Sequence, residues 1–267
     1  MFDSILTIIL LVGLISLSAA LAGTVGIGGG GFFSSILMII GGLSISVAIP
    51  IASIIIVGVG LASTLVNIQK KTINYKLALI LEPTTILGTI IGIQLHLIVS
   101  ETILIFIFSV IMICLTVRTY LKAREIRRSI SNKESDPLPF DSEFSSNRIL
   151  YGMIGSLIAG MISALVGIGG GLIKVPMLTE LGLSPEIASG TGSFMVLFTS
   201  ISTAVQFLLF QRLDLKIGII FFFIGFFASL LGSSFSRYNT RPDVFHYFLS
   251  LAMGSSTFLI LLQWLFL

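Results

Sequence analysis

Two glycine-rich runs are the residues of this chain best suited to chemistry, because each offers backbone amides to an anion. They read Val25-Gly26-Ile27-Gly28-Gly29-Gly30 and Val166-Gly167-Ile168-Gly169-Gly170-Gly171. Each lies between apolar segments, and glycine costs a helix about 1 kcal/mol per residue against alanine, so each run predicts a helix break. A helix that restarts after a break presents unpaired N–H groups and the positive end of its dipole, and glycine lets an anion approach both.

We therefore expect the two breaks to meet near the middle of a bilayer and to bind a small anionic substrate. The alternative is that these glycines only let helices cross closely. Breaks at matching places in two hydrophobic halves are typical of secondary transporters, which favours substrate binding. The predicted backbone ligands are Gly26, Gly28, Gly29, Gly30, Gly167, Gly169, Gly170 and Gly171.

Few ionisable side chains lie within the apolar segments, where each costs about 2.5 to 3.5 kcal/mol at the bilayer centre. Lys174 follows the second run closely, and its charge could neutralise a substrate anion. Snorkelling to the membrane surface or an ion pair with Glu180 explains it equally well. Glu82 could carry a coupling proton, and because its counterpart is Phe222 the role would belong to one half. A structural ion pair between Glu82 and a nearby lysine is at least as good an explanation.

Hydroxyl groups form a third candidate group. The run Ser189-Gly190-Thr191-Gly192-Ser193 interrupts another apolar segment, and hydroxyls can contact an oxyanion. Thr191 and Ser193 are therefore predicted substrate ligands. The first-half counterpart, Ile49-Pro50-Ile51-Ala52-Ser53, keeps only the serine and adds a proline.

Other chemistries have little support in the sequence. The first glycine run satisfies the G-x-G-x-x-G pattern of dinucleotide sites, but it follows an apolar span rather than a strand, and the second run has Leu172 where the third glycine belongs. The chain has no Gly-Lys-Ser or Gly-Lys-Thr phosphate loop and no His-Glu-x-x-His metal motif. We expect no enzymatic activity, no catalytic residue, no metal and no cofactor.

Composition predicts a membrane protein, because 55% of residues are apolar and only 10% are charged. A span needs about 20 apolar residues. Two shorter pieces, at 32–40 and 172–181, follow the glycine runs and are about 15 Å long. We expect an all-α polytopic membrane protein with two repeated halves of about four transmembrane helices each, plus a half-helix or re-entrant segment after each break. The expected spans are 5–22, 46–68, 75–97, 102–121, 148–166, 186–210, 215–235 and 244–267.

The chain divides into a first transmembrane repeat at 1–121, a hydrophilic linker at 122–147 and a second transmembrane repeat at 148–267. Internal duplication is indicated because Asn74-Tyr75-Lys76 corresponds to Asp214-Leu215-Lys216. The spaced pair Gly88 and Gly92 corresponds to Ala228 and Gly232, small residues that favour close helix packing. Segment lengths favour eight crossings, with both halves in the same orientation, over ten crossings with an inverted second half.

The linker also predicts the orientation in the membrane. Its early part is basic, with Arg124, Arg127 and Arg128 next to a helix end, so the positive-inside rule places the linker in the cytoplasm. Binding of anionic lipid is an alternative role for these residues. We expect a multi-pass protein of the plasma membrane. A cleaved signal peptide at 1–22 is disfavoured, because this segment carries Asp3 and no basic residue and has an internal counterpart at 148–166.

At these residues the chain resembles the sulfite exporter TauE/SafE family, also called the 4-toluene sulfonate uptake permease family. The resemblance rests on the doubled glycine run, the Lys174-Val175-Pro176 that follows it, Gly190-Thr191-Gly192-Ser193, and the Asn/Asp-x-Lys that precedes a long helix. It covers essentially the whole chain apart from the linker, and 74–88 and 178–182 look closest to the plant-type branch. Pro50-Ile51-Ala52 departs from the family's usual Gly-Thr.

The resemblance implies a duplicated transporter of sulfur-containing or organic anions such as sulfite, sulfonates or sulfoacetate. The predicted function is secondary anion transport, coupled to protons or driven by the substrate's own gradient. An anion channel is the nearest alternative, and an intramembrane enzyme is a remote one. The expected partners are the small anionic substrate, the lipid bilayer and a proton as candidate coupling ion, with no nucleic acid. The identity of the anion, the direction of transport and the oligomeric state stay open.

Overall fold

The protein is a bundle of helices in the part of the chain that the computed structural model describes, residues 5–25, 28–132, 146–235 and 254. Seven of these helices are long and apolar enough to cross a membrane, and α2 and α7 have 10 residues each. The predicted all-α polytopic fold with a short helix after each break is confirmed; the expected span 244–267 lies outside the described residues, except for Gly254. The helices are α1 (Ile5–Val25), α2 (Gly30–Ile39), α3 (Ile45–Lys70), α4 (Tyr75–Ile98), α5 (Glu101–Asn132), α6 (Ser146–Val166), α7 (Gly171–Glu180), α8 (Pro185–Leu209) and α9 (Leu215–Phe235).

The beginning of the predicted linker is helical. α5 continues to Asn132, past the apolar part that ends at Leu121. Residues 122–132 contain good helix formers such as alanine, arginine and glutamate, and the first proline comes only at Pro137, so nothing in the sequence stops the helix. The hydrophilic segment therefore starts as an extension of a span.

Corresponding positions of the two halves have the same local structure. The connections that follow α3 and α8 each contain a non-glycine residue with a positive φ angle, Lys71 at 56° and Gln211 at 55°. The Asn/Asp-x-Lys pattern begins the next helix in each half: the Asn74 side chain accepts a hydrogen bond from Leu77 N, and Asp214 Oδ1 accepts one from Lys216 N. The pattern is thus an N-cap that satisfies amides at the start of a helix.

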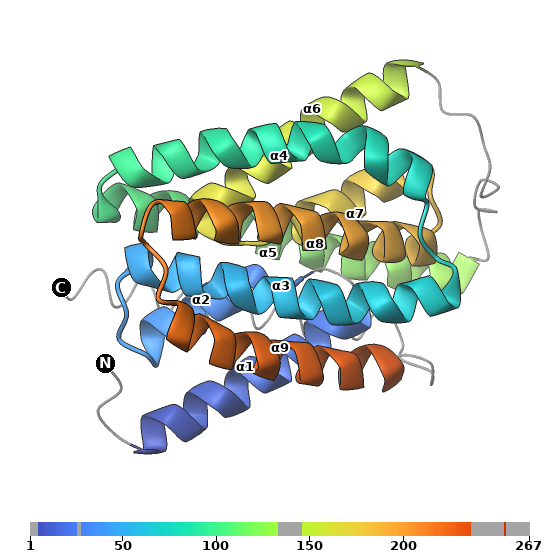
Figure 1. The fold of residues 1–267 in the computed structure, drawn as a ribbon. Helices are drawn as coiled ribbons and strands as arrows, with labels where there is room; N and C mark the ends of the chain where they lie inside the picture. The colour runs from blue at the N-terminus through green and yellow to red at the C-terminus, as the bar shows by residue number, and fades with distance from the viewer. Residues whose placement is uncertain (1–4, 26–27, 133–145, 236–253, 255–267) are drawn as a thin grey trace.

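The two halves exchange their fourth described helices. α4 of the first half packs against α6 and α8 of the second, whereas α9 of the second half packs against α1 and α3 of the first. Figure 1 shows the two resulting groups, one with α4, α6, α7 and α8 and the other with α1, α2, α3 and α9. α3 and α8 contact each other and join the groups. Each group of described helices therefore combines elements of both halves.

Small residues make the exchanged contacts possible. A Cβ on Gly160 of α6 would collide with the Thr85 carbonyl of α4, and a Cβ on Gly88 would collide with the Leu157 carbonyl of α6. In the other group, a Cβ on Gly232 of α9 would collide with the Ala20 carbonyl of α1. In lipid, where hydrophobicity does not hold apolar helices together, such close backbone approach is the main source of packing energy.

The two halves are inverted with respect to each other. α3 and its counterpart α8 are antiparallel, because Gly60 lies against Leu197 while Asn67 bonds Ser193. α9 runs parallel to α3, since Gly58 faces Phe222 and Ser63 contacts Ser229. α4 runs parallel to α8. The contacts between these two helices, in order along both, are Asn74 to Thr191, Glu82 to Thr199 and Thr89 to Ser202. α4 therefore runs opposite to its own counterpart, α9.

This finding corrects the expectation of two halves in the same orientation. α1 and α2 form a helical hairpin: α2 starts inside the bundle and returns to the end at which α1 began, and α3 leaves from that end (Figure 1). The other half repeats this with α6 and α7 from the opposite end. In the first half α3, α4 and α5 then cross the bundle in turn, so α6 starts from the end opposite to α1 and the second half is inverted.

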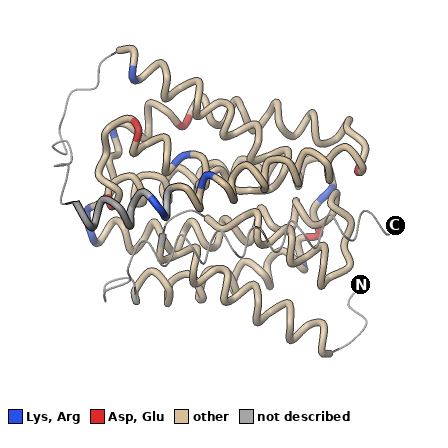
Figure 2. Tube along the Cα trace, turned by 180° about the vertical axis from the view of Figure 1, so that it is seen from behind, with Lys and Arg blue, Asp and Glu red and all other residues tan. Residues whose placement is uncertain are grey.

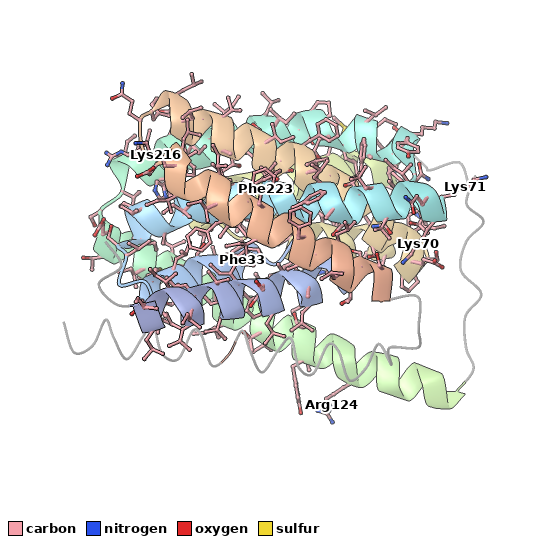
Figure 3. The ribbon with its side chains drawn as sticks, turned by 60° about the horizontal axis from the view of Figure 1, so that its bottom comes forward. Phe33, Lys70, Lys71, Arg124, Lys216 and Phe223 are labelled. Atoms are coloured by element: carbon pink, nitrogen blue, oxygen red, sulfur yellow. The ribbon has the colours of Figure 1, made fainter. Side chains whose placement is uncertain are left out.

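Charge and burial fit a bilayer around this bundle. Charged residues gather toward the two ends of the bundle and are sparse between them (Figure 2). Lys70 and Lys71 lie at one end and Lys216 at the other (Figure 3). The most hydrophobic window of α3 is 72% buried, whereas that of α1 is 22% buried although its hydropathy is equally high. α3 is thus central, and α1 presents apolar side chains outward, as lipid requires.

The inverted arrangement predicts that Lys71 and Lys216 lie on opposite sides of the membrane. Lys71→Cys and Lys216→Cys, each in a Cys114→Ser background, should react with a membrane-impermeant maleimide from opposite faces. Labelling of intact cells and of inside-out vesicles measures this. Reaction of both cysteines from the same face would contradict the inverted arrangement.

Candidate functional site

Both glycine runs break the chain between a long and a short helix, as the sequence predicted. In the first, Gly28 and Gly29 have φ angles of 78° and 65°, and Gly29 is the N-cap of α2. In the second, Gly169 and Gly170 have φ angles of 76° and 69°, and Gly170 is the N-cap of α7. A side chain would strain the backbone in this left-handed region, so the backbone conformation is by itself a sufficient reason for glycine at these positions. Gly26 lies outside the described residues.

The two breaks are in direct contact at the centre of the bundle. Gly30, the first residue of α2, lies against the backbone of Gly167 and Ile168, where a Cβ would collide. Ser34 of α2 donates a hydrogen bond to the Gly167 carbonyl at 3.4 Å. α2 and α7 run away from this junction toward opposite ends of the bundle, so their N-termini converge (Figure 1).

Each break also packs against the central helix of the opposite half. A Cβ on Gly28 would be 2.7 Å from Val196 of α8, and a Cβ on Gly169 would be 3.1 Å from Ile56 of α3. Gly28 corresponds to Gly169, and Ile56 corresponds to Val196. The junction is therefore close to two-fold symmetric in its backbone and in its apolar walls.

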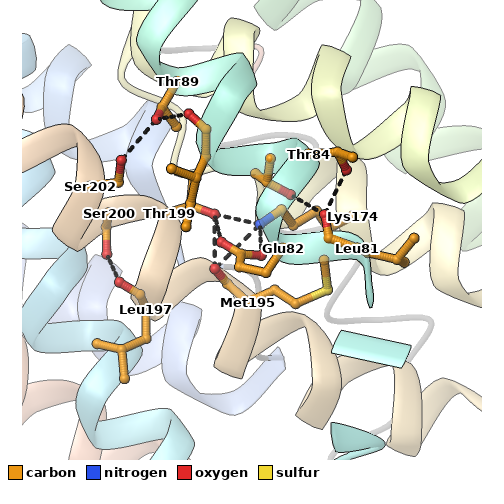
Figure 4. Close-up of polar contacts among 12 residues, drawn as sticks. Leu81, Glu82, Thr84, Thr89, Lys174, Met195, Leu197, Thr199, Ser200 and Ser202 are labelled. Carbon is orange, nitrogen blue, oxygen red and sulfur yellow. Dashed lines mark hydrogen bonds and ion pairs between the residues drawn. The ribbon is translucent and has the colours of Figure 1, made fainter. Parts of the chain in front are cut away.

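Beside the second break lies a buried ion pair, shown in Figure 4. Lys174 of α7 is fully buried, and its Nζ donates to Glu82 Oε2 of α4 at 3.0 Å. The same Nζ donates to Thr199 Oγ1 at 2.5 Å and to the Met195 carbonyl at 3.3 Å, both on α8. Thr199 Oγ1 lies 2.7 Å from Glu82 Oε1, to which it donates. One ion pair thus joins three helices.

This geometry decides among the explanations for the two ionisable residues. Lys174 does not snorkel and does not pair with Glu180, which instead pairs with Arg118 of α5 at 2.7 Å in an exposed position. The expectation of a structural lysine partner for Glu82 is met by Lys174. The pair also adjoins the break, because a Cβ on Gly170 would be 3.6 Å from Lys174 Cε.

The predicted hydroxyl ligands bind the connection between α3 and α4. Thr191 Oγ1 accepts a hydrogen bond from Asn74 N at 2.9 Å. Ser193 Oγ accepts one from Asn67 Nδ2 at 3.3 Å and donates to the Ser189 carbonyl. In this structure the two side chains thus tie the start of α8 to the end of α3, on the side toward which α7 runs.

Thr199 was not among the residues predicted from the sequence, although a signal for it was present. Lys174, Glu82 and Thr199 correspond in the other half to Phe33, Phe222 and Val59, which are all apolar. Three polar departures from the repeat therefore gather at one place in space. Because a buried charge needs a partner, polar residues whose counterparts in the other half are apolar can be expected to contact one another.

Comparison with known proteins supports the assignment to a transporter family. The family model described as sulfite exporter TauE/SafE matches residues 9–256. A Bacillus subtilis protein described as probable membrane transporter protein YunE is 26% identical over 238 residues, which cover 81% of this chain and 85% of that protein. No solved structure matches.

Plant proteins match more closely over shorter stretches. Sulfite exporter TauE/SafE family proteins 6 and 5 of Arabidopsis thaliana are 37% identical over 110 residues and 43% identical over 77 residues. These matches cover 41% and 29% of this chain but only 24% and 17% of the plant proteins. The resemblance inferred from the glycine runs, including its plant side, is confirmed, and the relatives' names describe exporters and a transporter rather than enzymes.

The ion pair predicts a strong coupling between two substitutions. Glu82→Leu leaves the Lys174 charge buried without a partner, which should cost about 3 to 5 kcal/mol of stability, whereas Glu82→Leu with Lys174→Met should recover most of that loss. Melting temperatures of the purified proteins measure both effects.

The exposed pair Arg118 and Glu180 is the matched control, and Glu180→Gln should shift the melting temperature little. A double variant no more stable than Glu82→Leu would show that the pair is not the determinant of stability here.

Proposed function

The chain belongs to the sulfite exporter TauE/SafE family, and on that premise we propose that it is a secondary transporter of small sulfur-containing or organic anions, of the sulfite, sulfonate or sulfoacetate class. It is an integral multi-pass membrane protein, with seven described helices long and apolar enough to span. The substrate is held between the two glycine breaks, so both halves contribute to one site.

The observation that carries this proposal is the junction of the two breaks. Inside an apolar bundle, Gly30 at the N-terminus of α2 lies against Gly167 and Ile168 of the second break, shortly before α7 starts at Gly171. The first amides of each helix have no partner within the helix, and both dipoles direct their positive ends to the junction. Such a pair of N-termini attracts an anion without any buried cation, and the glycines let the anion approach the backbone.

Side chains extend the proposed site from the junction toward one end of the bundle. Lys174, beside Gly170, supplies the positive charge nearest to the second break. Thr191 and Ser193 supply hydroxyls farther along, for a state in which they exchange their bonds to the α3–α4 connection for bonds to the substrate. The backbone ligands are the glycines of both runs, Gly26, Gly28, Gly29, Gly30, Gly167, Gly169, Gly170 and Gly171.

We further propose that the protein lies in the plasma membrane with its linker in the cytoplasm. Basic residues are concentrated at the end of the bundle where α5 stops and α6 starts, namely Lys70, Lys71, Lys76, Arg118, Arg124 and Arg148. The described basic residues at the opposite end are Arg212 and Lys216. The positive-inside rule favours the richer end as cytoplasmic.

The proposal predicts that an anion of this class binds the folded protein and raises its melting temperature. The purified protein is tested with sulfite, thiosulfate, methanesulfonate, sulfoacetate and acetate, and the stabilising anions are then followed as saturable uptake into proteoliposomes. Flux that does not saturate would instead identify a channel, and stabilisation by none of the anions would contradict the proposal.

A matched pair of glycine substitutions tests the location of the site. Gly170 and Gly42 have similar φ angles, 69° and 61°, and at neither would a Cβ meet another atom closer than 3.6 Å. Gly170→Ala and Gly42→Ala therefore carry similar backbone strain and no collision. Gly170→Ala should weaken anion binding at least tenfold, because the added methyl group keeps the anion away from the backbone amides and a lost hydrogen bond to a charged group is about 1.5 to 3 kcal/mol. Equal affinities of the two variants would place the anion elsewhere.

A further inference from the structure

The ammonium of Lys174 is saturated in this structure. An ammonium has three N–H donors, and Lys174 Nζ has three acceptors, on Glu82, Thr199 and Met195. All of these groups are enclosed: Lys174 and Thr199 are 0% exposed and Glu82 is 5% exposed. A substrate anion therefore cannot bind this lysine by addition. It must replace an acceptor that is already there, and the one of matching charge is the Glu82 carboxylate.

Charge balance fixes the condition for that replacement. Lys174 and Glu82 form a neutral pair, and an anion placed beside both would leave a net negative charge in a buried site, at a cost of many kcal/mol. Protonation of Glu82 removes that charge and also removes the attraction that holds Glu82 on the lysine. The anion and a proton then enter the site as one neutral unit.

No other charged group contacts the pair among the residues that the structure describes. The remaining titratable groups of the helices packed around it lie toward helix ends, and Glu180 is already paired with Arg118. These titratable groups are Tyr75, Lys76 and His96 on α4, Arg148 and Tyr151 on α6, Glu180 on α7, and Glu186 on α8, with Lys70 on the adjoining α3. The proton is thus assigned to Glu82.

An unused hydroxyl lies at the same level of the bundle. Ser156 of α6 is 0% exposed, and its Oγ has no hydrogen-bond partner in the described structure. It sits midway between Gly152, which faces Leu81 of α4, and Gly160, which faces Thr85. Glu82 lies between those two α4 residues, so Ser156 and Glu82 are at the same level along the axes of α6 and α4. A buried hydroxyl without a partner is costly, and a displaced carboxyl or an incoming oxyanion would satisfy it.

The pair occurs once, although the breaks occur twice. The corresponding first-half positions are Phe33, Val59 and Phe222, which cannot exchange a proton or an anion. The junction itself is nearly symmetric, so the ion pair is what distinguishes its two sides. One such pair provides for one proton with each anion.

We propose that Glu82 is a built-in substitute for the substrate's anionic group, which leaves Lys174 only when protonated, so that one proton is transported with each monovalent anion. This inference rests on the proposed function and names the coupling ion and the residues that couple it. As the site opens, a proton from the solvent adds to the Glu82 carboxylate and the anion takes its place on Lys174. When the anion leaves, the proton leaves and the ion pair forms again.

Methanesulfonate is the probe for the test, because it stays a monovalent anion at all working pH values. Over the range in which Glu82 is ionised in the free protein, affinity should weaken about tenfold per unit of rising pH, since binding takes up one proton. In proteoliposomes, flux should carry one proton per anion, follow an imposed pH gradient and ignore a potassium diffusion potential. These wild-type measurements need no variant.

The variant Glu82→Gln should bind methanesulfonate with an affinity that no longer depends on pH. Its flux should lose the response to a pH gradient and gain a response to the membrane potential, because an uncompensated anion now crosses. A merely structural role of Glu82 would lower the amount of active protein without this change in driving force. Glu180→Gln, which removes an exposed carboxylate from the same helix as Lys174, should behave as the wild type.

Two results overturn the inference while the proposed function stands: wild-type flux that responds to voltage without proton movement, or pH-driven accumulation that persists in Glu82→Gln. If the wild type binds and carries neither methanesulfonate nor any other anion of the panel, the proposed function fails first, and the coupling inference fails with it.

Discussion

The structure depends on one contact, in which the backbone of the first glycine run lies directly against the backbone of the second. Gly30 meets Gly167 and Ile168 with no room for a side chain, and positive φ angles on both sides turn the chain sharply enough to start a new helix there. Because the contact is between backbones, it brings the N-terminus of α2 against the second break, and α7 starts a few residues further along the chain, at Gly171. The helix dipoles concentrate polarity at the junction, and the Lys174–Glu82 ion pair adjoins it on one side.

The exchange of α4 and α9 gives this contact its rigid frame. Each break is supported by a central helix of the other half, through Val196 at Gly28 and Ile56 at Gly169. The exchanged helices hold the long arms of the two hairpins by close glycine packing, α4 against α6 and α9 against α1. A relative movement of the two groups must change the junction, because the breaks lie where the groups meet. Under the proposed function, such a movement would provide alternating access to the site at the junction.

The buried ion pair is present on only one side of a junction whose backbone is nearly two-fold symmetric. The ion pair of Lys174 and Glu82 joins α4, α7 and α8 on one side of the junction, where the other side has Phe33, Val59 and Phe222. A buried pair is often no more stabilising than apolar side chains of the same volume, and the proposed proton coupling gives this pair a role beyond stability. The state described here is closed around that pair.

The sequence by itself determined the elements and the chemistry of the breaks. Apolar run length set the seven described spans, glycine content set the two breaks and the short helices after them, and the doubled motif supported the family. The tertiary structure decided orientation and partnership. The sequence could not show whether the short helices return to the end where the long ones began, because apolar residues suit a segment of either direction, and so the orientation of the halves was predicted wrongly. It also could not assign Lys174 to Glu82, 92 residues away, rather than to Glu180, which is near in the chain. Hydrophobicity is a property of each segment and can be read locally, whereas an ion pair is a property of two segments and exists only where packing brings them together.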